Sequence, residues 1–362
     1  MVSIETVLVL GAYGLAGREV VAGLLAKTDL AVIATGRNPA KLGALAARLA
    51  DPRLATRRLD AYDAGALARA CADADLVINA VGPYAVGGAG IARTVLESGR
   101  PYVDFANEQS HYRRLESLAA LARQKRLLLL TAAGEIPGLS TLIVLQAVER
   151  LPDVQEVDVF YAQGRAPDEE SGIGSYLGGV LEVGFLGRRV ERRIERMPEP
   201  FGEVQMVAVP TIEALTVPKH TPLRALENWW ALGEIPPGTE ALIRLLKPHE
   251  RAWARRFFER LTRWAKRGEY RRALQKGLTS AGVIKVVARA PQGRWEAILH
   301  VADGGLATSY LPVLAARRLA EGKLDAVGLV TPIDVFEPTA TFRELAALGW
   351  PLEVRESQST QR

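Results

Sequence analysis

The sequence of 362 residues has a single cysteine, Cys71, and four histidines that lie far apart along the chain. One thiol excludes an internal disulfide framework and any metal site built from several thiolates. No His-Glu-x-x-His sequence occurs, so we expect no metal centre. No apolar run approaches the length of about 20 residues that a membrane span requires, and the N-terminus lacks the basic region of a secretory signal. These absences predict a soluble, cytoplasmic protein.

The basic charge of the chain is concentrated in two segments. The sequence holds 46 Lys and Arg against 41 Asp and Glu, a formal net charge of +5. Residues 188–196 carry five arginines against two glutamates, and residues 251–276 carry ten Lys or Arg against two glutamates. The remainder is close to balance, so the basic character belongs to these segments alone. We therefore expect no nucleic-acid partner.

The first 135 residues alternate between short apolar runs and stretches with helical spacing. Apolar runs that hardly alternate are typical of strands covered by helices on both faces. Strands and helices in this order predict an α/β fold with a parallel, doubly wound sheet of the Rossmann type. The strands are expected at residues 6–10, 30–35, 54–60, 75–80, 101–105 and 126–131.

The pattern changes after Pro137 and predicts a second, α+β domain for substrate binding and dimerisation. Runs 154–163 and 203–217 are strand-like, 222–276 has helical spacing, and 283–290 and 295–302 flank a Pro-Gln-Gly turn that predicts a hairpin. We expect the first domain at residues 1–135 plus about 306–355 and the second at 136–305, with a helical, basic-aromatic insertion at about 186–276 and a frayed tail at 356–362.

Three glycines lie where the first strand gives way to the first helix. Gly11, Gly14 and Gly17 are spaced three residues apart in Gly-Ala-Tyr-Gly-Leu-Ala-Gly. The first glycine permits a tight turn, the second lets the backbone approach a pyrophosphate, and the third lets the helix pack closely on the sheet. The N-terminus of the helix attracts the anion. We therefore predict that a dinucleotide is bound by Gly11, Tyr13, Gly14, Leu15 and Gly17.

The residues after the second strand distinguish between the two nicotinamide dinucleotides. An Asp or Glu there binds the ribose 2′-hydroxyl of NAD, whereas an Arg accommodates the 2′-phosphate of NADP. This chain has Thr35-Gly36-Arg37-Asn38, with one guanidinium and no carboxylate. The planar guanidinium fork suits a phosphate, so the sequence predicts NADP(H) as the cofactor.

Residues after the later strands complete the predicted crevice, because ligands in such folds lie beyond the carboxyl ends of the strands. Asp60 is predicted to accept from the adenine amino group, and the small residues after the fourth strand leave room for ribose and nicotinamide. The alternatives are a plain loop carboxylate at Asp60 and a packing role for Tyr84. The expected cofactor residues beyond the glycine loop are Thr35, Arg37, Asn38, Asp60, Asn79, Ala80, Val81, Gly82 and Tyr84.

These segments resemble the saccharopine dehydrogenase-like oxidoreductases. The matching residues are the glycine loop, Gly36-Arg37-Asn38, Asn79 to Tyr84, Tyr102-Val103-Asp104 with Glu108, and Pro137-Gly138-Leu139-Ser140. Ser171-Gly172-Ile173-Gly174-Ser175 is similar to a Ser-Gly-Gly-Thr segment near the substrate in that family. The resemblance spans 1–140, is weaker over 165–185 and 280–350, and is absent over 186–276. It implies a two-domain NAD(P)-dependent reductase or dehydrogenase and leaves the substrate open.

The group that transfers a proton is not assigned by the sequence. Hydride transfer to or from a C=N or C=C bond creates charge that a general acid or water neutralises, unless an imine nitrogen already carries the proton. The weak candidates are Tyr84, Glu108, Ser175 and Tyr176. No tyrosine precedes a lysine by four residues, which argues against the Tyr-x-x-x-Lys mechanism of short-chain reductases. A non-catalytic NADP-binding protein is the alternative.

The segment 251–276 combines its basic residues with an aromatic stripe. Trp253, Phe257, Leu261 and Trp264 fall on one face of a predicted helix, and the basic residues lie largely off it. A core or subunit-interface helix is one interpretation. The other is an amphipathic helix that lies on an anionic membrane surface or encloses a hydrophobic substrate, which would favour an enoyl-type reductase. The expected partners are a small-molecule substrate and, as further candidates, a second copy of the chain or a membrane surface.

Overall fold

The computed structural model describes residues 4–164, 182, 191–231, 239–248, 251, 253–254, 256–258, 260–261 and 281–358. The chain forms two units, the first comprising Met1–Leu139 and Gly305–Val335 and the second Ser140–Gly304 and Phe336–Arg362. The return of the chain to the first unit therefore ends at Val335, whereas the sequence analysis extended it to about residue 355. The residues after Val335 join the second unit because its sheet accepts their strand.

The first unit is built on a seven-stranded sheet whose strands are all parallel, as the sequence predicted. The spatial order is β13-β6-β5-β4-β1-β2-β3. Because β1 lies between β2 and β4, the strand order reverses there, and ligands of such sheets lie beyond the carboxyl ends at that point. The strands are β1 (Thr6–Leu10), β2 (Ala31–Gly36), β3 (Leu54–Arg58), β4 (Leu76–Asn79), β5 (Tyr102–Asp104), β6 (Leu128–Leu130) and β13 (Gly328–Val330).

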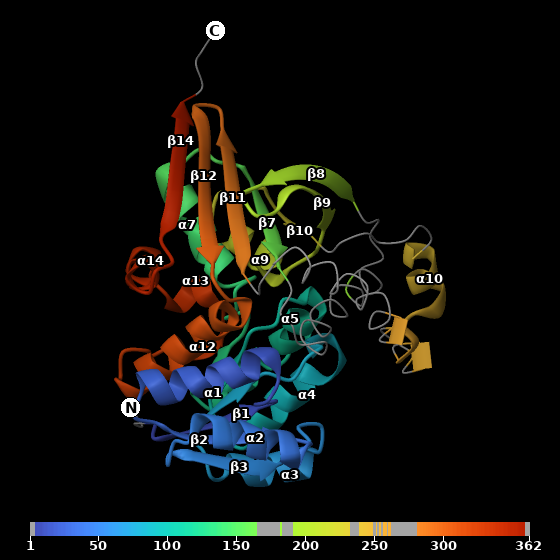
Figure 1. Ribbon diagram of the computed structural model, residues 1–362, viewed down its shortest axis with the longest axis vertical. Helices are drawn as coiled ribbons and strands as arrows, with labels where there is room; N and C mark the ends of the chain where they lie inside the picture. The colour runs from blue at the N-terminus through green and yellow to red at the C-terminus, as the bar shows by residue number, and fades with distance from the viewer. Residues whose placement is uncertain are drawn as a thin grey trace. The chain divides into compact units, whose positions relative to one another are not determined.

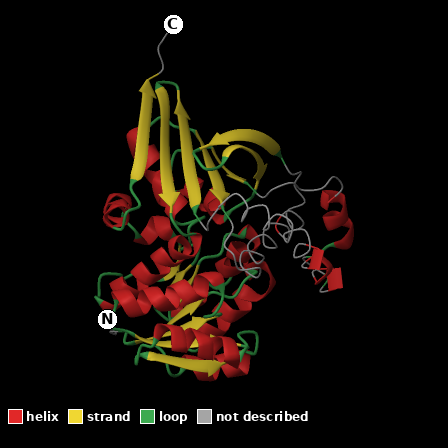
Figure 2. Ribbon diagram, viewed as in Figure 1, coloured by secondary structure: helices red, strands yellow, loops and turns green. Residues whose placement is uncertain are grey.

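Helices cover this sheet (Figures 1 and 2). Helix α12 packs on helix α1. A Cβ on Gly23 of α1 would stand 2.9 Å from Cγ2 of Val313 in α12. The Lys27 ammonium of α1 lies 5.5 Å from the ring centroid of Tyr310 in α12. The helices are α1 (Leu15–Lys27), α2 (Pro39–Leu49), α3 (Ala64–Cys71), α4 (Tyr84–Glu97), α5 (Gln109–Glu116), α6 (Ala119–Gln124), α12 (Gly304–Ala320) and α13 (Pro332–Val335).

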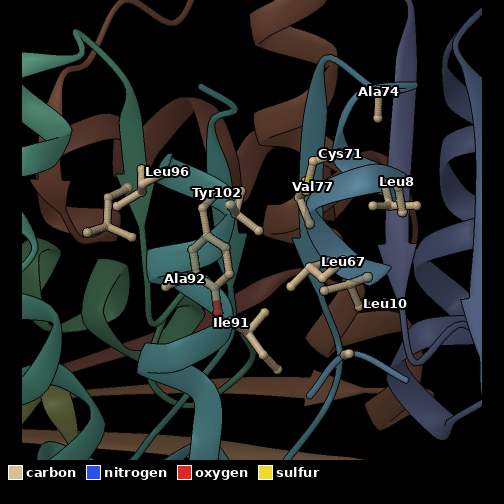
Figure 3. Close-up of a cluster of buried hydrophobic side chains, with 14 of the residues drawn as sticks. Leu8, Leu10, Leu67, Cys71, Ala74, Val77, Ile91, Ala92, Leu96 and Tyr102 are labelled. Carbon is tan, nitrogen blue, oxygen red and sulfur yellow. The ribbon is translucent and has the colours of Figure 1, made fainter. Parts of the chain in front are cut away.

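One hydrophobic cluster of the first unit lies between its strands and α3 to α6 (Figure 3). Leu8, Leu67, Ile91 and Tyr102 are among its fully or almost fully buried side chains. The single cysteine belongs to this cluster, and burial raises the pKa of the Cys71 thiol to about 11. A thiol held in its neutral form is a poor nucleophile, so Cys71 serves packing.

The second unit contains a mixed seven-stranded sheet of order β14-β12-β11-β7-β10-β9-β8 (Figure 1). Its longest hairpin, β11 with β12, is connected by the predicted Pro-Gln-Gly turn. The strands are β7 (Glu156–Gln163), β8 (Arg192–Met197), β9 (Gly202–Ala208), β10 (Ala225–Trp230), β11 (Gly282–Ala290), β12 (Gly293–Val301) and β14 (Leu352–Gln358). The helices are α7 (Leu139–Arg150), α9 (Ile212–Thr216), the 3₁₀ turn η1 (Val217–Lys219), α10 (Thr239–Leu246) and α14 (Pro338–Ala347).

Three segments of the second unit differ from the prediction. The basic stretch 192–197 forms strand β8, and 225–230, expected to be helical, forms strand β10 beside β7. The run 203–217, expected to be a strand throughout, ends as a strand at Ala208 and continues into α9. The short-range pattern failed at β10 because Leu226, Asn228 and Trp230 pack on one face and Trp229 on the other, so apolar residues occur on both.

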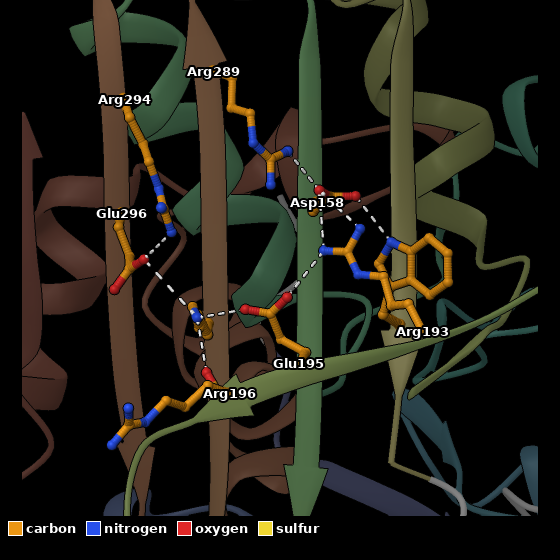
Figure 4. Close-up of polar contacts among 9 residues, drawn as sticks. Asp158, Arg193, Glu195, Arg196, Arg289, Arg294 and Glu296 are labelled. Carbon is orange, nitrogen blue, oxygen red and sulfur yellow. Dashed lines mark hydrogen bonds and ion pairs between the residues drawn. The ribbon is translucent and has the colours of Figure 1, made fainter. Parts of the chain in front are cut away.

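A polar network joins the curled edge of this sheet to its centre (Figure 4). Asp158 of β7 accepts hydrogen bonds from Arg193 (3.3 Å), Arg289 (2.6 Å) and the Trp229 indole (2.9 Å). The Arg193 guanidinium lies 4.2 Å from the Phe160 ring centroid and 4.4 Å from that of Trp229. These contacts connect β8 to β7. Arg193, one of the arginines of the basic stretch, therefore has a structural role.

Candidate functional site

The glycine loop occupies the carboxyl end of β1, beside β4. Gly11 has a φ of +73°, and a Cβ there would lie 2.9 Å from the carbonyl oxygen of Ala80. A Cβ on Gly17 would overlap the Gly11 carbonyl oxygen. Only glycine therefore fits either position, and the backbone follows the tight path predicted for pyrophosphate binding.

The first turn of α1 is suited to an anion. Gly14 is its N-cap and offers no side-chain hydrogen bond to the turn, and no acidic residue lies within the turn. Leu15 opens the helix at this point. A helix N-terminus with these features attracts negative charge through its N–H groups and its dipole.

The predicted cationic residue lies at the end of β2. Arg37 is exposed, and its guanidinium makes no hydrogen bond or ion pair within the described parts of the chain. The Tyr13 ring lies against Gly36, where a Cβ would overlap it, and the Lys41 ammonium is 5.7 Å from the centroid of the same ring. The structure therefore places Tyr13 and a second cation, Lys41, beside the turn that carries Arg37. Sequence reasoning missed Lys41, although its position in the first turn of α2 was a signal.

Two neighbours of Arg37 have local structural contacts. The Thr35 hydroxyl is buried and donates to the carbonyl oxygen of Val9 at 2.9 Å. The Asn38 side chain accepts from the N–H groups of Ala40 and Lys41, which caps α2. Because these side-chain atoms are engaged within the protein, Thr35 and Asn38 shape the loop that presents Arg37.

The other predicted cofactor residues follow β3 and β4. Asp60 is exposed and accepts from the N–H of Tyr62 at 3.1 Å. Asn79 is fully buried, donates to the Tyr102 hydroxyl at 2.8 Å and accepts from the N–H of Val81 at 3.0 Å. Ala80, Val81 and Gly82 are partly or largely exposed beyond the strand. Asn79 therefore fixes the turn, and the small residues after it form the open rim.

The side chains of Tyr84 and Glu108 both form hydrogen bonds with the backbone around the start of α4. Tyr84 is 7% exposed and its hydroxyl donates to the carbonyl oxygen of Asn79 at 2.8 Å. Glu108 is buried and accepts from the N–H groups of Tyr84 and Asn107, both at 3.0 Å. Burial is the main reason that the pKa of Glu108 lies above its ordinary value and that of Tyr84 well above it. Both side chains hold the start of α4. The other two candidates, Ser175 and Tyr176, lie outside the described residues.

A buried carboxylate–imidazole pair that sequence reasoning missed lies beside Tyr84. His111 Nε2 is 2.8 Å from Asp104 Oδ2, and the Thr131 hydroxyl donates to Asp104 Oδ1 at 2.6 Å. Burial raises the pKa of Asp104, but the His111 ring and these hydrogen bonds outweigh it and leave the pKa below its ordinary value. A Cβ on Gly88 of α4 would stand 2.7 Å from the ring. The available signal was that Asp104 and Thr131 end neighbouring strands.

The second unit has its own buried carboxyl group, also missed from the sequence. Glu213 of α9 is 1% exposed and accepts from the hydroxyls of Ser140 (2.6 Å) and Thr141 (2.9 Å) in the first turn of α7. Burial raises its pKa to about 7, against the opposing effect of hydrogen bonds from Ser140, Thr141 and Asn228. Ser140 was noted in the sequence only as part of a motif, and here it anchors a helix.

Among the described residues, no group of three or more His, Cys, Asp and Glu side chains is arranged to hold a metal ion. In the same parts of the chain, no helix has both the length and the apolar character needed to cross a bilayer.

Comparison with known proteins agrees with this geometry. Residues 7–129 match the family described as saccharopine dehydrogenase NADP binding domain. The apo saccharopine dehydrogenase (L-Glu forming) from Saccharomyces cerevisiae shares 14% identity over 98% of this chain and 100% of its own, with a TM-score of 0.65. An oxidoreductase domain protein from Kribbella flavida shares 13% identity over 98% and 99%, with a TM-score of 0.47. No curated protein matches the chain. At these identities the structural likeness concerns the fold.

Proposed function

Since residues 7–129 match the saccharopine dehydrogenase NADP-binding domain family, we propose that the protein is an NADP(H)-dependent oxidoreductase that transfers hydride to or from a C=N or C=C bond. The observation that carries the proposal is the pairing of the glycine cradle at the β1–β4 reversal with the exposed Arg37 at the end of β2. Neither the glycine cradle nor Arg37 identifies the substrate.

The cradle accounts for the pyrophosphate. A side chain at Gly11 or Gly17 would fill the space that the backbone leaves, and the first turn of α1 carries no competing carboxylate. Two phosphate groups would therefore meet N–H donors and the positive end of a helix dipole, without an acidic side chain in the first turn.

Arg37 and Lys41 account for the additional phosphate of NADP(H). Both are cationic: Arg37 follows Gly36, against which the Tyr13 ring packs, and the Lys41 ammonium lies 5.7 Å from the centroid of that ring. An aromatic face flanked by cations can accept an adenine ring and a 2′-phosphate together. The segment 35–38 has no carboxylate to receive a free 2′-hydroxyl, which favours NADP(H) over NAD(H).

NADP(H) supplies or removes the hydride, and the chain positions the reactants. Asn79, Tyr84 and Glu108 fix the rim formed by Ala80 to Gly82. We assign Tyr84 and Glu108 to positioning, because their polar atoms are bonded to the backbone. A protonated imine needs no acid from the protein, since hydride addition to carbon neutralises the nitrogen directly. For a C=C bond, a general acid or a bound water must supply the proton.

Fluorescence titration with the two reduced cofactors tests the proposal. NADPH is expected to bind at least about tenfold more tightly than NADH, because a charge-assisted contact to the 2′-phosphate is lost with NADH. Arg37→Ala should remove most of that difference and leave NADH binding unchanged. Arg48→Ala, at the opposite end of α2 and also exposed, is the matched control. Equal affinities for both cofactors in the unaltered protein would contradict the NADP(H) assignment.

The engagement of Tyr84 and Glu108 with the backbone also favours a second candidate, a non-catalytic NADP-binding protein. A turnover screen with imines, enoyl thioesters and ketones separates the two. Tight NADPH binding with no turnover of any class would support the second candidate, whereas turnover of one class would exclude it and identify the bond that is reduced.

A further inference from the structure

Residues 253–254, 256–258 and 260–261 of the second unit are helical, and this helix has a buried face. Ala254 and Phe258 are 0% and 2% exposed, and Phe258 clusters with Ile243 of α10, which is 3% exposed. Leu242 and Leu246 of α10 pack around this cluster. The contact with α10 therefore satisfies one apolar face of the helix.

A second apolar face of the same helix is exposed. Trp253, Phe257 and Leu261 are 57%, 45% and 38% exposed. They are spaced four residues apart, so they form one continuous stripe along the helix. Large apolar side chains arranged in an exposed row mark an interaction site more often than scattered ones do.

Arginines border this stripe. Arg256 and Arg260 are exposed and follow Trp253 and Phe257 by three residues, the spacing that makes side chains neighbours on a helix. Arg251 is also exposed just before the helix. An apolar row with a cationic row along its edge matches the boundary between acyl chains and anionic headgroups.

We propose that this face binds an anionic lipid surface. Trp253, Phe257 and Leu261 enter the acyl boundary, and Arg256 and Arg260 lie against the lipid phosphates. Binding is peripheral, because no described helix can cross a bilayer. A second copy of the chain fits less well, since symmetric pairing of this face would oppose arginine rows with like charge. Nucleic acid would leave the aliphatic end of the stripe, Leu261, without a partner. The proposal is independent of the proposed oxidoreductase activity.

Cosedimentation of the full chain with vesicles at about 0.15 M salt tests this proposal, since the surface potential still attracts basic residues there. Vesicles of phosphatidylcholine with phosphatidylserine are expected to bind at least about tenfold more strongly than phosphatidylcholine alone. The combined change Trp253→Ser, Phe257→Ser and Leu261→Ser should reduce binding at least about tenfold. Ile194→Ser is the matched control, because Ile194 is 75% exposed on β8, outside the helix.

The charged row has its own variants. Arg256→Ala and Arg260→Ala should each weaken binding to the anionic vesicles by about fivefold, and Arg355→Ala, with a side chain 69% exposed on β14, should not. Unchanged circular dichroism and urea unfolding in every variant show that the fold persists. No vesicle binding by the unaltered protein overturns the proposal. So does a dimer in light scattering that the triple change converts to a monomer, or DNA binding that it abolishes without an effect on vesicles.

Discussion

At the scale of single residues, the glycines of the first unit differ in what a methyl group would meet. A Cβ on Gly17 would overlap the carbonyl oxygen of Gly11, which is backbone and cannot turn away. Gly43, in the interior of α2, has no atom within 4 Å of such a Cβ. Substitution at Gly17 therefore tests close packing at the cofactor loop, whereas substitution at Gly43 tests helix propensity alone.

Gly17→Ala should destabilise the protein by about 1–3 kcal/mol, because an added methyl group forces the loop away from α1. It should also weaken NADPH binding at least about tenfold, since the displaced glycine loop no longer follows the backbone path that the pyrophosphate requires. Gly43→Ala should raise stability by about 0.5–1 kcal/mol through helix propensity and leave NADPH binding unchanged. Urea unfolding and fluorescence titration measure both effects. Normal NADPH binding by the Gly17 variant would show that the loop is not the pyrophosphate site.

At the scale of helices and strands, Glu213 connects α9 to the first turn of α7. Its partners Ser140, Thr141 and Asn228 are all neutral. Oε1 of Glu213 and Oδ1 of Asn228 are buried without a hydrogen-bond donor among the described residues. Burial without a cationic partner in the described parts of the chain, and with Oε1 lacking a donor there, penalises the charge, so the neutral acid fits the site better than the carboxylate.

This contact makes stability depend on pH with a definite sign. The pKa of Glu213 is raised in the folded state, to about 7 from 4.5, so folding favours the protonated form. The stabilisation is present in full below pH 4.5, declines as the pH rises, and is lost once the pH passes about 7. Between pH 5 and pH 8 the decline amounts to about 2–3 kcal/mol.

Glu213→Gln should abolish that decline, because glutamine stays neutral at every pH. The free energy of unfolding of the variant, relative to the unaltered protein, should therefore rise by about 2–3 kcal/mol from pH 5 to pH 8. Urea titrations at both values measure it. Glu203→Gln, at an exposed position of β9, should show no such change. A constant difference between the Glu213 variant and the unaltered protein would mean that Glu213 is ionised throughout.

The sequence predicted most of the first sheet because its strands are apolar on both faces and glycine marks the turn after β1. β8 was missed because most of its side chains are charged, and β10 was missed because buried side chains occur on both of its faces. At the site, Gly11 and Arg37 were predicted from position alone. His111 was not predicted, although its partner Asp104 lies only 7 residues away. Glu213 was not predicted because Ser140 and Thr141 lie 73 and 72 residues away, and short-range spacing carries no record of such contacts.

At the scale of the whole molecule, the chain passes between its two units three times, after Leu139, Gly304 and Val335. Each unit nevertheless has its own sheet and its own hydrophobic clusters. All the residues that we assign to the cofactor belong to the first unit. NADPH binding should therefore stabilise the first unit alone, at the carboxyl ends of the strands of its sheet.

Hydrogen exchange with and without saturating NADPH tests this localisation. At a cofactor concentration about 100 times the Kd, amides that open only when NADPH dissociates should exchange about 100-fold more slowly. We expect this slowing in peptides covering residues 10–17, 35–41 and 79–84, and unchanged rates in peptides from β7 and β11, whose core residues such as Phe160 and Val287 are buried within the second sheet. Gly17→Ala should remove the slowing in all three peptides, while Gly43→Ala retains it. Equal slowing across β7 and β11 would contradict cofactor binding by the first unit alone, because the binding energy would then be shared by both sheets.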